Sequence, residues 1–257
     1  MSFSYEELAE IRHYIHQHPE LSGQEYQTTA FLKERLEELG IRILESGLKT
    51  GLIAEIGSGQ PVVALRADID ALPILEQTNL PYQSQNPGIM HACGHDFHQT
   101  SLLGAAALLK EKEDQLEGTV RLIFQPAEEI SEGASDVLAT GLLEDVQGII
   151  GFHNIPQLKA GQLALNAGAM MAGVEKFKVT VTGVSSHAAR PDLGVDTVTA
   201  VTTMVQNLQL LISRTVSPFE TAVLSITHLD VGSTWNVLPK SGYFEGTIRS
   251  FNPSVQR

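Results

Sequence analysis

Cysteine is almost missing from the sequence, because Cys93 is the only one in 257 residues. A single cysteine cannot form a disulfide within the chain, so the fold does not require an oxidising compartment. Basic residues are also scarce, with 17 lysines and arginines against 30 aspartates and glutamates and a formal net charge of −13. Nucleic acids and anionic membranes select basic surfaces, so we expect neither as a partner.

Long apolar runs are absent as well, and none reaches the length of a membrane span. The first eight residues have neither the basic nor the apolar segment of a signal peptide. We therefore expect a cytoplasmic protein. A hydrophobic fraction of 42% and a charged fraction of 18% are typical of a globular protein with a sizeable core. The length suits one large domain or two domains.

The stretch from Met90 to His98 is the most unusual part of the chain, because it contains Cys93 and three of the nine histidines. Cys93 and His95 are separated by one residue, and in extended backbone this spacing directs both side chains to one side. A thiolate and an imidazole together suit a divalent transition metal. Asp96 and Gln99 have the spacing of a capping box, which predicts that a helix starts at Asp96.

A simpler interpretation of this stretch has no metal. In it Cys93 is a small core residue, Asp96 only caps the helix, and His91 and His98 are surface groups. Short metal-like motifs often occur by chance, so the choice depends on where the other acidic and histidine clusters lie.

Helices and strands alternate along the first part of the chain. Apolar spacing and turn residues predict helices at 5–18, 24–39, 96–109 and 133–143 and strands at 52–56, 62–66, 119–124 and 148–152. The first two strands are expected to form a hairpin, and the strand at 148–152 is expected to be buried. The alternation predicts an α/β fold whose mixed sheet has substantial parallel character.

Three of these predicted strands are followed by residues of the types that commonly bind metals. They are Asp68 and Asp70, Glu128 and Glu129, and His153. In an open α/β sheet, ligands bind outside the carboxyl ends of the strands, and the loop with Cys93 and His95 can reach the same edge. Aspartates after a strand are also common turn residues. Four clusters of ligand types at one edge nevertheless favour a metal site.

The character of the sequence changes between Ala167 and Gly173, where small residues predict a hinge or, alternatively, a surface loop. Beyond it the pattern predicts an α+β layer with strands at 176–182, 222–227 and 242–248 and a helix at 195–214. We therefore expect a catalytic domain at 1–172 and a second domain at 173–257. One helix on so short a sheet predicts that the second domain is incomplete.

Seven motifs together carry a resemblance to a known family. They are the segment from Arg12 to Glu20, Arg66–Pro73 (RADIDALP), His91–Asp96 (HACGHD), Gln125–Glu129 (QPAEE), Gly151–His153 (GFH), Ser186–Ala188 (SHA) and Gly246–Arg249 (GTIR). The chain resembles the di-metal amidohydrolases of the aminoacylase and carboxypeptidase G2 peptidase family. Its likeness is to the branch of hippurate hydrolase, N-acetyl-diaminopimelate deacetylase and the indole-acetyl-amino-acid hydrolases.

The resemblance implies roles for most of the clusters in the first domain. Metal ligands would be Cys93, His95, Glu129 and His153; Glu128 would be the general base; Asp68, Asp70 and Asp96 would orient the ligands. The cofactor would be two divalent metal ions, manganese or zinc, with cobalt and nickel also suited to such ligands. The metals would activate a water and polarise the amide carbonyl. The alternative for the adjacent glutamates is that both are solvated surface groups.

The second domain would be a lid and dimerisation domain in this family, which implies a homodimer. His187 would stabilise the oxyanion and reach the neighbouring subunit's active site. Asn236 and Arg249 would bind the substrate carboxylate, Arg249 through a bidentate pair. The alternative is that all three are ordinary polar surface groups.

The implied activity is metal-dependent hydrolysis of N-acyl amino acids, for example N-acetyl amino acids. Family chains return from the lid to the catalytic domain and supply a last histidine ligand there. This sequence ends at Arg257, so the resemblance implies that this ligand lies outside it and that the chain alone binds two metals poorly. Two rival functions are a non-catalytic remnant that binds metal or a partner subunit, and a cysteine hydrolase with Cys93 as its nucleophile.

Overall fold

The computed structural model describes residues 3–256 and divides into two compact units, Met1–Lys159 and Ala160–Arg257. The first two residues and Arg257, at the outer ends of the two predicted domains, lie outside the described residues. The predicted domain boundary after residue 172 stays a prediction. Among residues 3–256, no helix combines the length and the apolar character that crossing a membrane requires.

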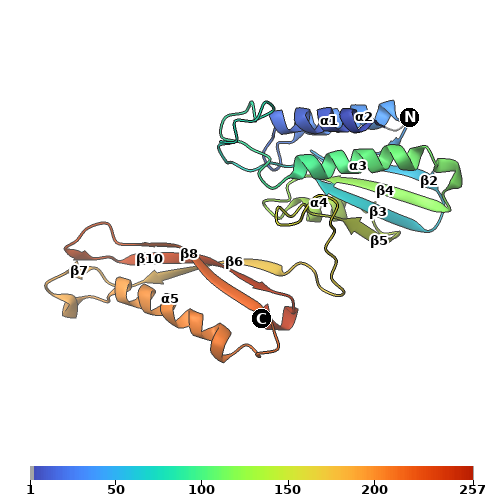
Figure 1. Cartoon of the computed structure of the whole chain (residues 1–257). Helices are drawn as coiled ribbons and strands as arrows, with labels where there is room; N and C mark the ends of the chain where they lie inside the picture. The colour runs from blue at the N-terminus through green and yellow to red at the C-terminus, as the bar shows by residue number, and fades with distance from the viewer. Residues whose placement is uncertain (1–2, 257) are drawn as a thin grey trace. The chain divides into compact units, whose positions relative to one another are not determined.

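The first unit is an α/β fold built on a five-stranded sheet (Figure 1). Its helices are α1 (Tyr5–Gln17), α2 (Tyr26–Glu38), α3 (His95–Lys110) and α4 (Gly133–Ala139), with a 3-10 turn at Glu113–Gln115. Its strands are β1 (Arg42–Leu44), β2 (Leu52–Ser58), β3 (Val62–Asp68), β4 (Gly118–Gln125) and β5 (Val146–Gly151). Among the strands of this unit, β1, which has three residues, is not predicted from the sequence.

The strand order is β1-β2-β4-β3-β5. β4 pairs antiparallel with β2 and parallel with β3, and β3 pairs parallel with β5. The mixed sheet is therefore confirmed, and its parallel part is β4-β3-β5. The carboxyl ends of these three strands share one edge of the sheet, as the alternation of helices and strands predicts.

The predicted hairpin of β2 and β3 is wrong, because β4 lies between the two strands. Their short connection crosses the beginning of β4, where the Thr119 N–H donates to the Pro61 carbonyl at 2.9 Å. At Gly118, which has a φ of 129°, a Cβ atom would collide with that same carbonyl oxygen. The connection can cross β4 there because position 118 has no side chain.

The core of the first unit lies on both faces of the sheet, as the two-residue period of a strand requires. On β2, Leu52, Ala54 and Ile56 point into the larger cluster, beneath α2 and α3, whereas Ile53 points to the other face with Val137 of α4. The prediction that the strand at 148–152 is buried is wrong. β5 is an edge strand, and its Ile150 is 69% exposed.

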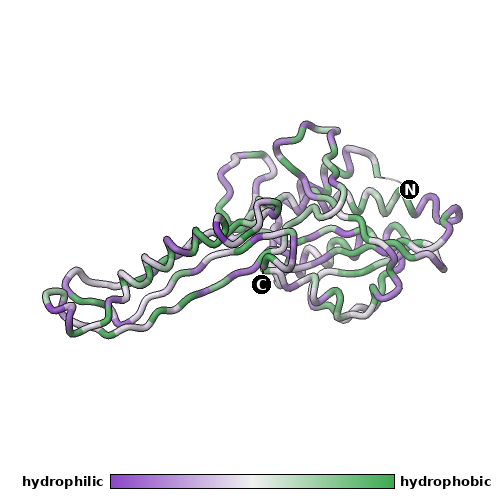
Figure 2. Tube along the Cα trace, turned by 90° about the horizontal axis from the view of Figure 1, so that it is seen from below, coloured by the Kyte–Doolittle hydropathy of each residue, from purple (hydrophilic) through white to green (hydrophobic). Residues whose placement is uncertain are grey.

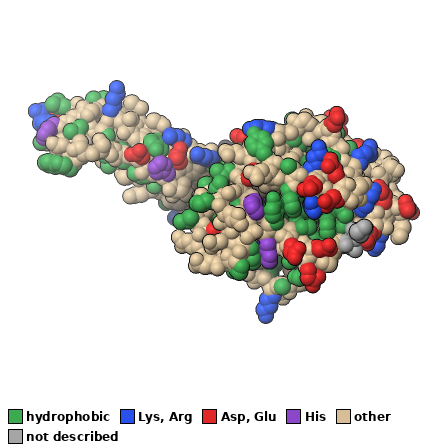
Figure 3. Space-filling view, turned by 90° about the horizontal axis from the view of Figure 1, so that it is seen from above, with side chains coloured by type: hydrophobic (Ala, Val, Ile, Leu, Met, Phe, Trp, Pro, Cys, Tyr) green, Lys and Arg blue, Asp and Glu red, His purple; other side chains and the backbone are tan. Residues whose placement is uncertain are grey.

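The charged surface of the first unit is mixed in sign on the face drawn in Figure 3, where acidic and basic side chains are interspersed. Ion pairs within α2 join Lys33 to Glu37 and Arg35 to Glu38, both between exposed or partly exposed side chains. Such surface pairs contribute little to stability. The excess of acidic residues therefore does not make this face uniformly negative.

The second unit is the predicted α+β layer. Its strands are β6 (Gly173–Thr182), β7 (Ser186–His187), β8 (Ala222–Val231), β9 (Val237–Leu238) and β10 (Ser241–Ser250), and its helices are α5 (Thr197–Arg214) and α6 (Pro253–Gln256), with a 3-10 turn at Pro191–Leu193. β6, β10 and β8 form an antiparallel sheet in that order, and β7 pairs with β9. Hydrophobic and hydrophilic residues alternate along α5 (Figure 2), and its Val201 is fully buried.

Two leucines of α3 provide a test of the core. Leu103 is 0% exposed and Leu108 on the same helix is 56% exposed. We expect Leu103→Ala to lower the free energy of unfolding by about 2–5 kcal/mol, because it leaves a cavity between α3 and the sheet. Leu108→Ala is the matched control and should change it by less than about 0.5 kcal/mol. Urea denaturation measures both, and equal losses would contradict the described core.

Candidate metal centre

Potential metal ligands gather at the shared carboxyl edge of β3, β4 and β5. Asp68 is the last residue of β3, Glu128 and Glu129 follow β4, and His153 follows β5. His95 reaches the same place as the first residue of α3. The structure thus brings together the clusters that the sequence places at separate strand ends.

His95 is the common member of three groups of side chains whose ligand atoms lie within 4.8 Å of one another. The groups are Cys93 with His95 and His153, Asp68 with His95 and His98, and His95 with Glu128 and Glu129. Sγ of Cys93 is 3.4 Å from Nε2 of His153. The other three predicted ligands and the predicted base therefore lie around the imidazole of His95, and their roles stay predictions.

Two buried atoms in this cluster have no hydrogen-bond partner among the described residues. They are Nε2 of His95 and Oε1 of Glu129, which lie 3.8 Å apart. Nδ1 of His95 is 2.9 Å from the carbonyl oxygen of Asp70. A carbonyl can only accept, so Nδ1 carries a proton, and Nε2 faces the glutamate. A divalent cation would satisfy both atoms, and the donor set of thiol, imidazole and carboxylate fits one.

Asp70 joins three parts of this site through its carboxylate. It accepts hydrogen bonds from the Ser22 hydroxyl at 2.6 Å and from the Glu129 N–H at 2.9 Å, and its Oδ1 lies 3.2 Å from Nδ1 of His95. Burial raises the pKa of Asp70. The hydrogen bonds from His95 and Ser22 lower it and outweigh burial, so the pKa lies below its ordinary value. Asp70 therefore contacts one predicted ligand, His95, and the loop that carries another, Glu129.

Asp68 is paired on both sides of its carboxylate. Arg66 donates to Oδ2 at 2.7 Å, and Nδ1 of His98 lies 2.6 Å from Oδ1. Burial raises the pKa of Asp68, but the hydrogen bond with His98 and the charges of His95 and Arg66 outweigh it and bring the pKa to about 2. The carboxylate is therefore ionised at neutral pH and faces the cluster.

The interpretation in which His91 and His98 are surface groups is wrong. His91 is 3% exposed, and burial lowers its pKa to about 4. His98 is 0% exposed and contacts the site, although the sequence analysis gives it no role. Its spacing of three residues from His95 places both imidazoles on one face of α3. That spacing is the signal in the sequence from which His98 could have been found.

Burial and, after it, negative charge raise the pKa values of two groups at the centre of the site. Burial and then the neighbouring Glu129, Glu128 and Asp68 raise the pKa of the Cys93 thiol to about 12. Burial and the same kind of repulsion raise the pKa of Glu128 above its ordinary value. A bound cation reverses this effect, because it favours the thiolate and the carboxylate.

The predicted capping box of Asp96 and Gln99 is wrong. α3 begins at His95, and its N-cap is Gly94 in a left-handed conformation. The Asp96 side chain instead accepts from Nε of Arg12 at 3.0 Å and pairs with Nδ1 of His16 at 2.9 Å. The carboxylate thus binds two basic partners, the buried His16 and the partly exposed Arg12, instead of capping the helix. They lie in the first family motif, which the sequence analysis did not connect with Asp96.

Gly94 also lets two loops of the site approach each other. Cys93 lies in a turn rather than in the extended backbone assumed from its spacing to His95. Gly94 has a φ of 85°, and a Cβ atom there would collide with the side-chain amide of Asn154. The loop with Cys93 can therefore lie against the loop with His153 only because position 94 has no side chain.

The three predicted site residues of the second domain all lie in the second unit. His187 is in β7, which pairs with β9, and the Ala188 N–H donates to the Asn236 carbonyl at 3.0 Å. Asn236 directly precedes β9, so it lies close to His187 at the end of this small sheet. Arg249 is exposed on β10, in the other sheet of the unit. The roles of all three stay predictions.

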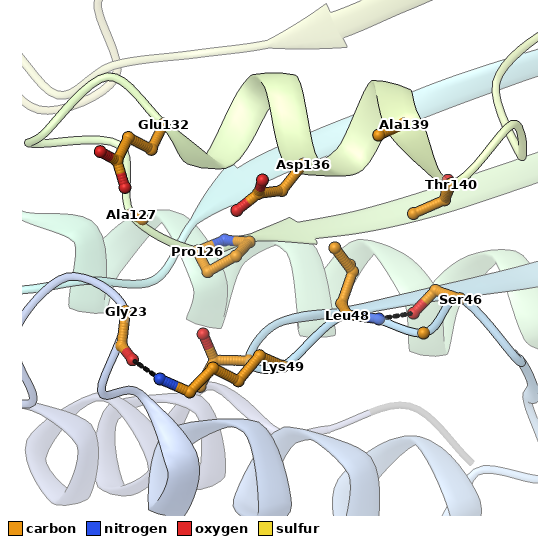
Figure 4. A pocket seen from close by; sticks show the side chains of 12 residues that line it. Gly23, Ser46, Leu48, Lys49, Pro126, Ala127, Glu132, Asp136, Ala139 and Thr140 are labelled. Carbon is orange, nitrogen blue, oxygen red and sulfur yellow. Dashed lines mark hydrogen bonds between the residues drawn. The ribbon is translucent and has the colours of Figure 1, made fainter.

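The first unit also contains a cavity of about 460 Å³ that is separate from the ligand cluster. It lies between the segment around Lys49 and the beginning of α4, which carries Glu132 and Asp136 (Figure 4). The ammonium of Lys49 donates to the Gly23 carbonyl at 3.4 Å. Pro126 and Ala127 form part of its wall, but Glu128 and the four predicted ligands do not.

The chain matches the sequence model of a known protein family. The model of peptidase family M20/M25/M40 matches residues 64–236, which include the whole ligand cluster. The chain belongs to this family. The family resemblance inferred from the seven motifs is thereby confirmed.

Individual relatives agree with the family assignment. The chain is 49% identical to the N-acetyl-L-cysteine deacetylase of Bacillus subtilis over 252 residues, which cover 97% of the chain and 61% of that protein. It is 43% identical to the IAA-amino acid hydrolase ILR1-like 5 of Arabidopsis thaliana, with 95% of the chain and 56% of that protein covered. The chain thus spans about three fifths of the length of these relatives.

A solved structure of the same family has the same fold. It is the Bacillus subtilis YXEP protein, described as a dinuclear metal binding peptidase from the M20 family. The two share 44% sequence identity with a TM-score of 0.82, over 97% of this chain and 65% of the other. The α/β architecture predicted from the sequence is therefore confirmed.

A pair of glycine substitutions tests the approach of the two loops. Gly94 and Gly88 both have a φ of 85°, but a Cβ at Gly88 meets nothing within 4 Å. Gly88→Ala should cost only the backbone strain of about 1–2 kcal/mol. Gly94→Ala should cost at least about 1 kcal/mol more, because the Asn154 side chain must move. Chemical denaturation measures the difference, and equal costs would rule out the close approach.

The buried pairs of Asp96 predict a pH dependence of stability. Burial raises its pKa, but His16 and Arg12 lower it from 3.8 to about 2. A lowered pKa stabilises the fold above the unfolded value near pH 4, by about 2 kcal/mol, and this stability is lost as the pH falls towards 2. Asp96→Asn should therefore be less stable at pH 7, and its free energy of unfolding should approach that of the parent below pH 4. The exposed Asp136→Asn is the control, and parallel pH profiles for Asp96→Asn and parent would contradict the pairing.

Proposed function

We propose that the protein is a metal-dependent amidohydrolase that cleaves the amide bond of N-acyl amino acids, including N-acetyl amino acids. The observation that carries this proposal is the pair of buried, unpartnered atoms Nε2 of His95 and Oε1 of Glu129, 3.8 Å apart. Cys93 and His153 lie beside them with their ligand atoms 3.4 Å apart. The relatives, an N-acetyl-L-cysteine deacetylase and an IAA-amino acid hydrolase, support it.

The proposed cofactor is two divalent metal ions, held by Cys93, His95, Glu129 and His153. Manganese and zinc suit this mixture of thiolate, imidazole and carboxylate, as do cobalt and nickel. When bound, such ions lower the pKa of water and polarise a carbonyl group. Asp70 keeps the imidazole of His95 and the Glu129 loop in place, and Asp68 keeps the imidazole of His98 in place. Asp96 is proposed to act only at a distance, through α3.

Glu128 is proposed as the general base. It is adjacent to the proposed ligand Glu129 in the loop after β4, and its carboxylate can accept a proton. In the proposed reaction it accepts a proton from the attacking water and passes a proton to the amide nitrogen. The bond between the carbonyl carbon and that nitrogen breaks, which releases a carboxylic acid and an amino acid.

The second unit is proposed to bind and cover the substrate. Arg249 is exposed on β10, where its guanidinium is free to form a bidentate pair with the carboxylate of an amino acid. Asn236 is proposed to assist it, and His187 to stabilise the oxyanion in a neighbouring subunit of a homodimer. The domain division after residue 172 and a cytoplasmic location are part of the same proposal.

The thiol of Cys93 argues against the rival cysteine hydrolase. A nucleophilic cysteine needs a lowered pKa, whereas burial and three carboxylates raise this one to about 12. The thiol is therefore protonated at neutral pH unless a cation lies beside it. A metal ligand fits this environment better than a nucleophile does.

The test is a measurement of metal content followed by an assay with N-acetyl amino acids, before and after treatment with a chelator. Because the relatives are longer, the assay includes a version of the chain extended with the C-terminal part of the B. subtilis deacetylase. We expect bound divalent metal and chelator-sensitive hydrolysis that added metal restores. Metal binding without turnover in either version would favour the non-catalytic remnant, and absence of metal binding would overturn the proposal.

Glu128→Gln separates the base from the ligands. The change keeps the shape of the side chain but removes its ability to accept a proton, so we expect turnover to fall about 10²–10⁴-fold with metal content unchanged. Glu132→Gln, an exposed glutamate in the same loop region, is the matched control and should retain turnover. Activity of Glu128→Gln near that of the parent would show that the base is another residue.

A further inference from the structure

His98 lies at the centre of the site but has no part in the proposed chemistry. It is 0% exposed on α3, one turn after His95. One ring nitrogen, Nδ1, is 2.6 Å from Oδ1 of Asp68. The other, Nε2, is 3.1 Å from the backbone nitrogen of Asn154. The imidazole therefore connects the end of β3 with the loop that follows β5.

The partners of the ring determine where its proton is. The backbone N–H of Asn154 can only donate, so Nε2 of His98 must accept and cannot carry a proton. Nδ1 then carries the proton and donates it to Oδ1 of Asp68. Both nitrogens are thus engaged, which leaves no lone pair for a cation. His98 is therefore not a metal ligand, although it belongs to one of the three ligand groups.

The ring of His98 also packs directly against the segment that it binds. Its centroid is 4.6 Å from that of His153 and 5.2 Å from that of Phe152, with interplanar angles of 72° and 69°. The ladder between β3 and β5 ends at Gly151, paired with Arg66. Beyond this last pair, the hydrogen bond from Asn154 to His98 ties the segment to the sheet through Asp68.

We propose that His98 is a positioning residue that fixes the segment from Phe152 to Asn154 against the end of β3, so that Nε2 of His153 faces Sγ of Cys93. Its effect on metal binding rests on the proposed metal centre. Its effect on the Asn154 amide does not depend on any metal. The two effects therefore require separate measurements.

Three substitutions of His98 remove its hydrogen bonds in different combinations. His98→Phe keeps the ring packing and removes both hydrogen bonds. His98→Gln can present an amide oxygen near the position of Nε2, which preserves an acceptor for the Asn154 N–H. His98→Asn can preserve the donor to Asp68 but is too short to reach Asn154. A matched control is His13→Phe, because His13 stacks on Tyr82 at 3.8 Å on α1.

Hydrogen exchange of the Asn154 amide in the metal-free chain is the first measurement. We expect exchange to become about 10-fold faster or more in His98→Phe and His98→Asn, since a lost hydrogen bond of about 1.4 kcal/mol corresponds to that factor. His98→Gln and His13→Phe should exchange at the rate of the parent. Equal exchange in the parent and His98→Phe would overturn the proposal, whether or not the chain binds metal.

Binding of Co²⁺ to the same variants is the second measurement. We expect affinity to fall about 10–100-fold in His98→Phe and His98→Asn, the usual effect of losing a group that orients a ligand. The cobalt absorption spectrum should shift in these variants and be restored in His98→Gln, which a general loss of stability would not produce. Parent-like affinity and spectrum in His98→Phe would overturn the positioning role. A parent chain that binds no cobalt would instead overturn the proposed metal centre and this second effect, while the exchange result would still stand.

Discussion

The buried carboxylate of Asp70 is the contact on which the ligand cluster depends. It receives hydrogen bonds from Ser22 after α1 and from the Glu129 backbone after β4, and it lies within 3.2 Å of Nδ1 of His95 on α3. Three segments that are far apart in the sequence therefore meet at one side chain. Loss of the carboxylate would remove the acceptor of the Ser22 hydroxyl and of the Glu129 N–H, whereas Nδ1 of His95 would keep only the Asp70 backbone carbonyl. The hydrogen bonds of this one aspartate therefore help to set the positions of His95 and Glu129.

The charge balance of the site favours a cation. Asp68 and Asp70 are held ionised by their hydrogen bonds, whereas the thiol of Cys93 and the carboxyl of Glu128 have raised pKa values. Burial and mutual repulsion thus resist further negative charge at the edge of the sheet. A divalent cation would remove this resistance and allow the thiol to ionise. Proton release on metal binding is the expected thermodynamic sign of that exchange.

The sequence predicts those features that depend on local order along the chain. Alternation of helices and strands places Asp68, Glu128 and His153 at one edge, and the structure confirms that they gather there. The hairpin of β2 and β3 and the cap at Asp96 fail for a different reason. β4 enters between the two strands from far along the chain, and Arg12 reaches Asp96 across 84 positions. Neighbouring residues carry no information about such partners, so local turn and capping rules choose the nearest candidates. His98 shows the same limit, because its spacing indicates a shared face but not its contact with Asn154.

The crossing of the connection between β2 and β3 over Gly118 has a consequence for the order of folding. The two strands are separated by only three residues, yet neither pairs with the other, and both pair with a strand that begins fifty residues after β3 ends. A nascent chain that has emerged only as far as residue 110 therefore has α1, α2 and α3 but no strand to fill the middle of its sheet. Pairings of such long sequence separation form slowly, because the chain must close a large loop first. During that interval the inner edges of β2 and β3 remain open, and during synthesis they are the part of the first unit most exposed to wrong pairing with other chains.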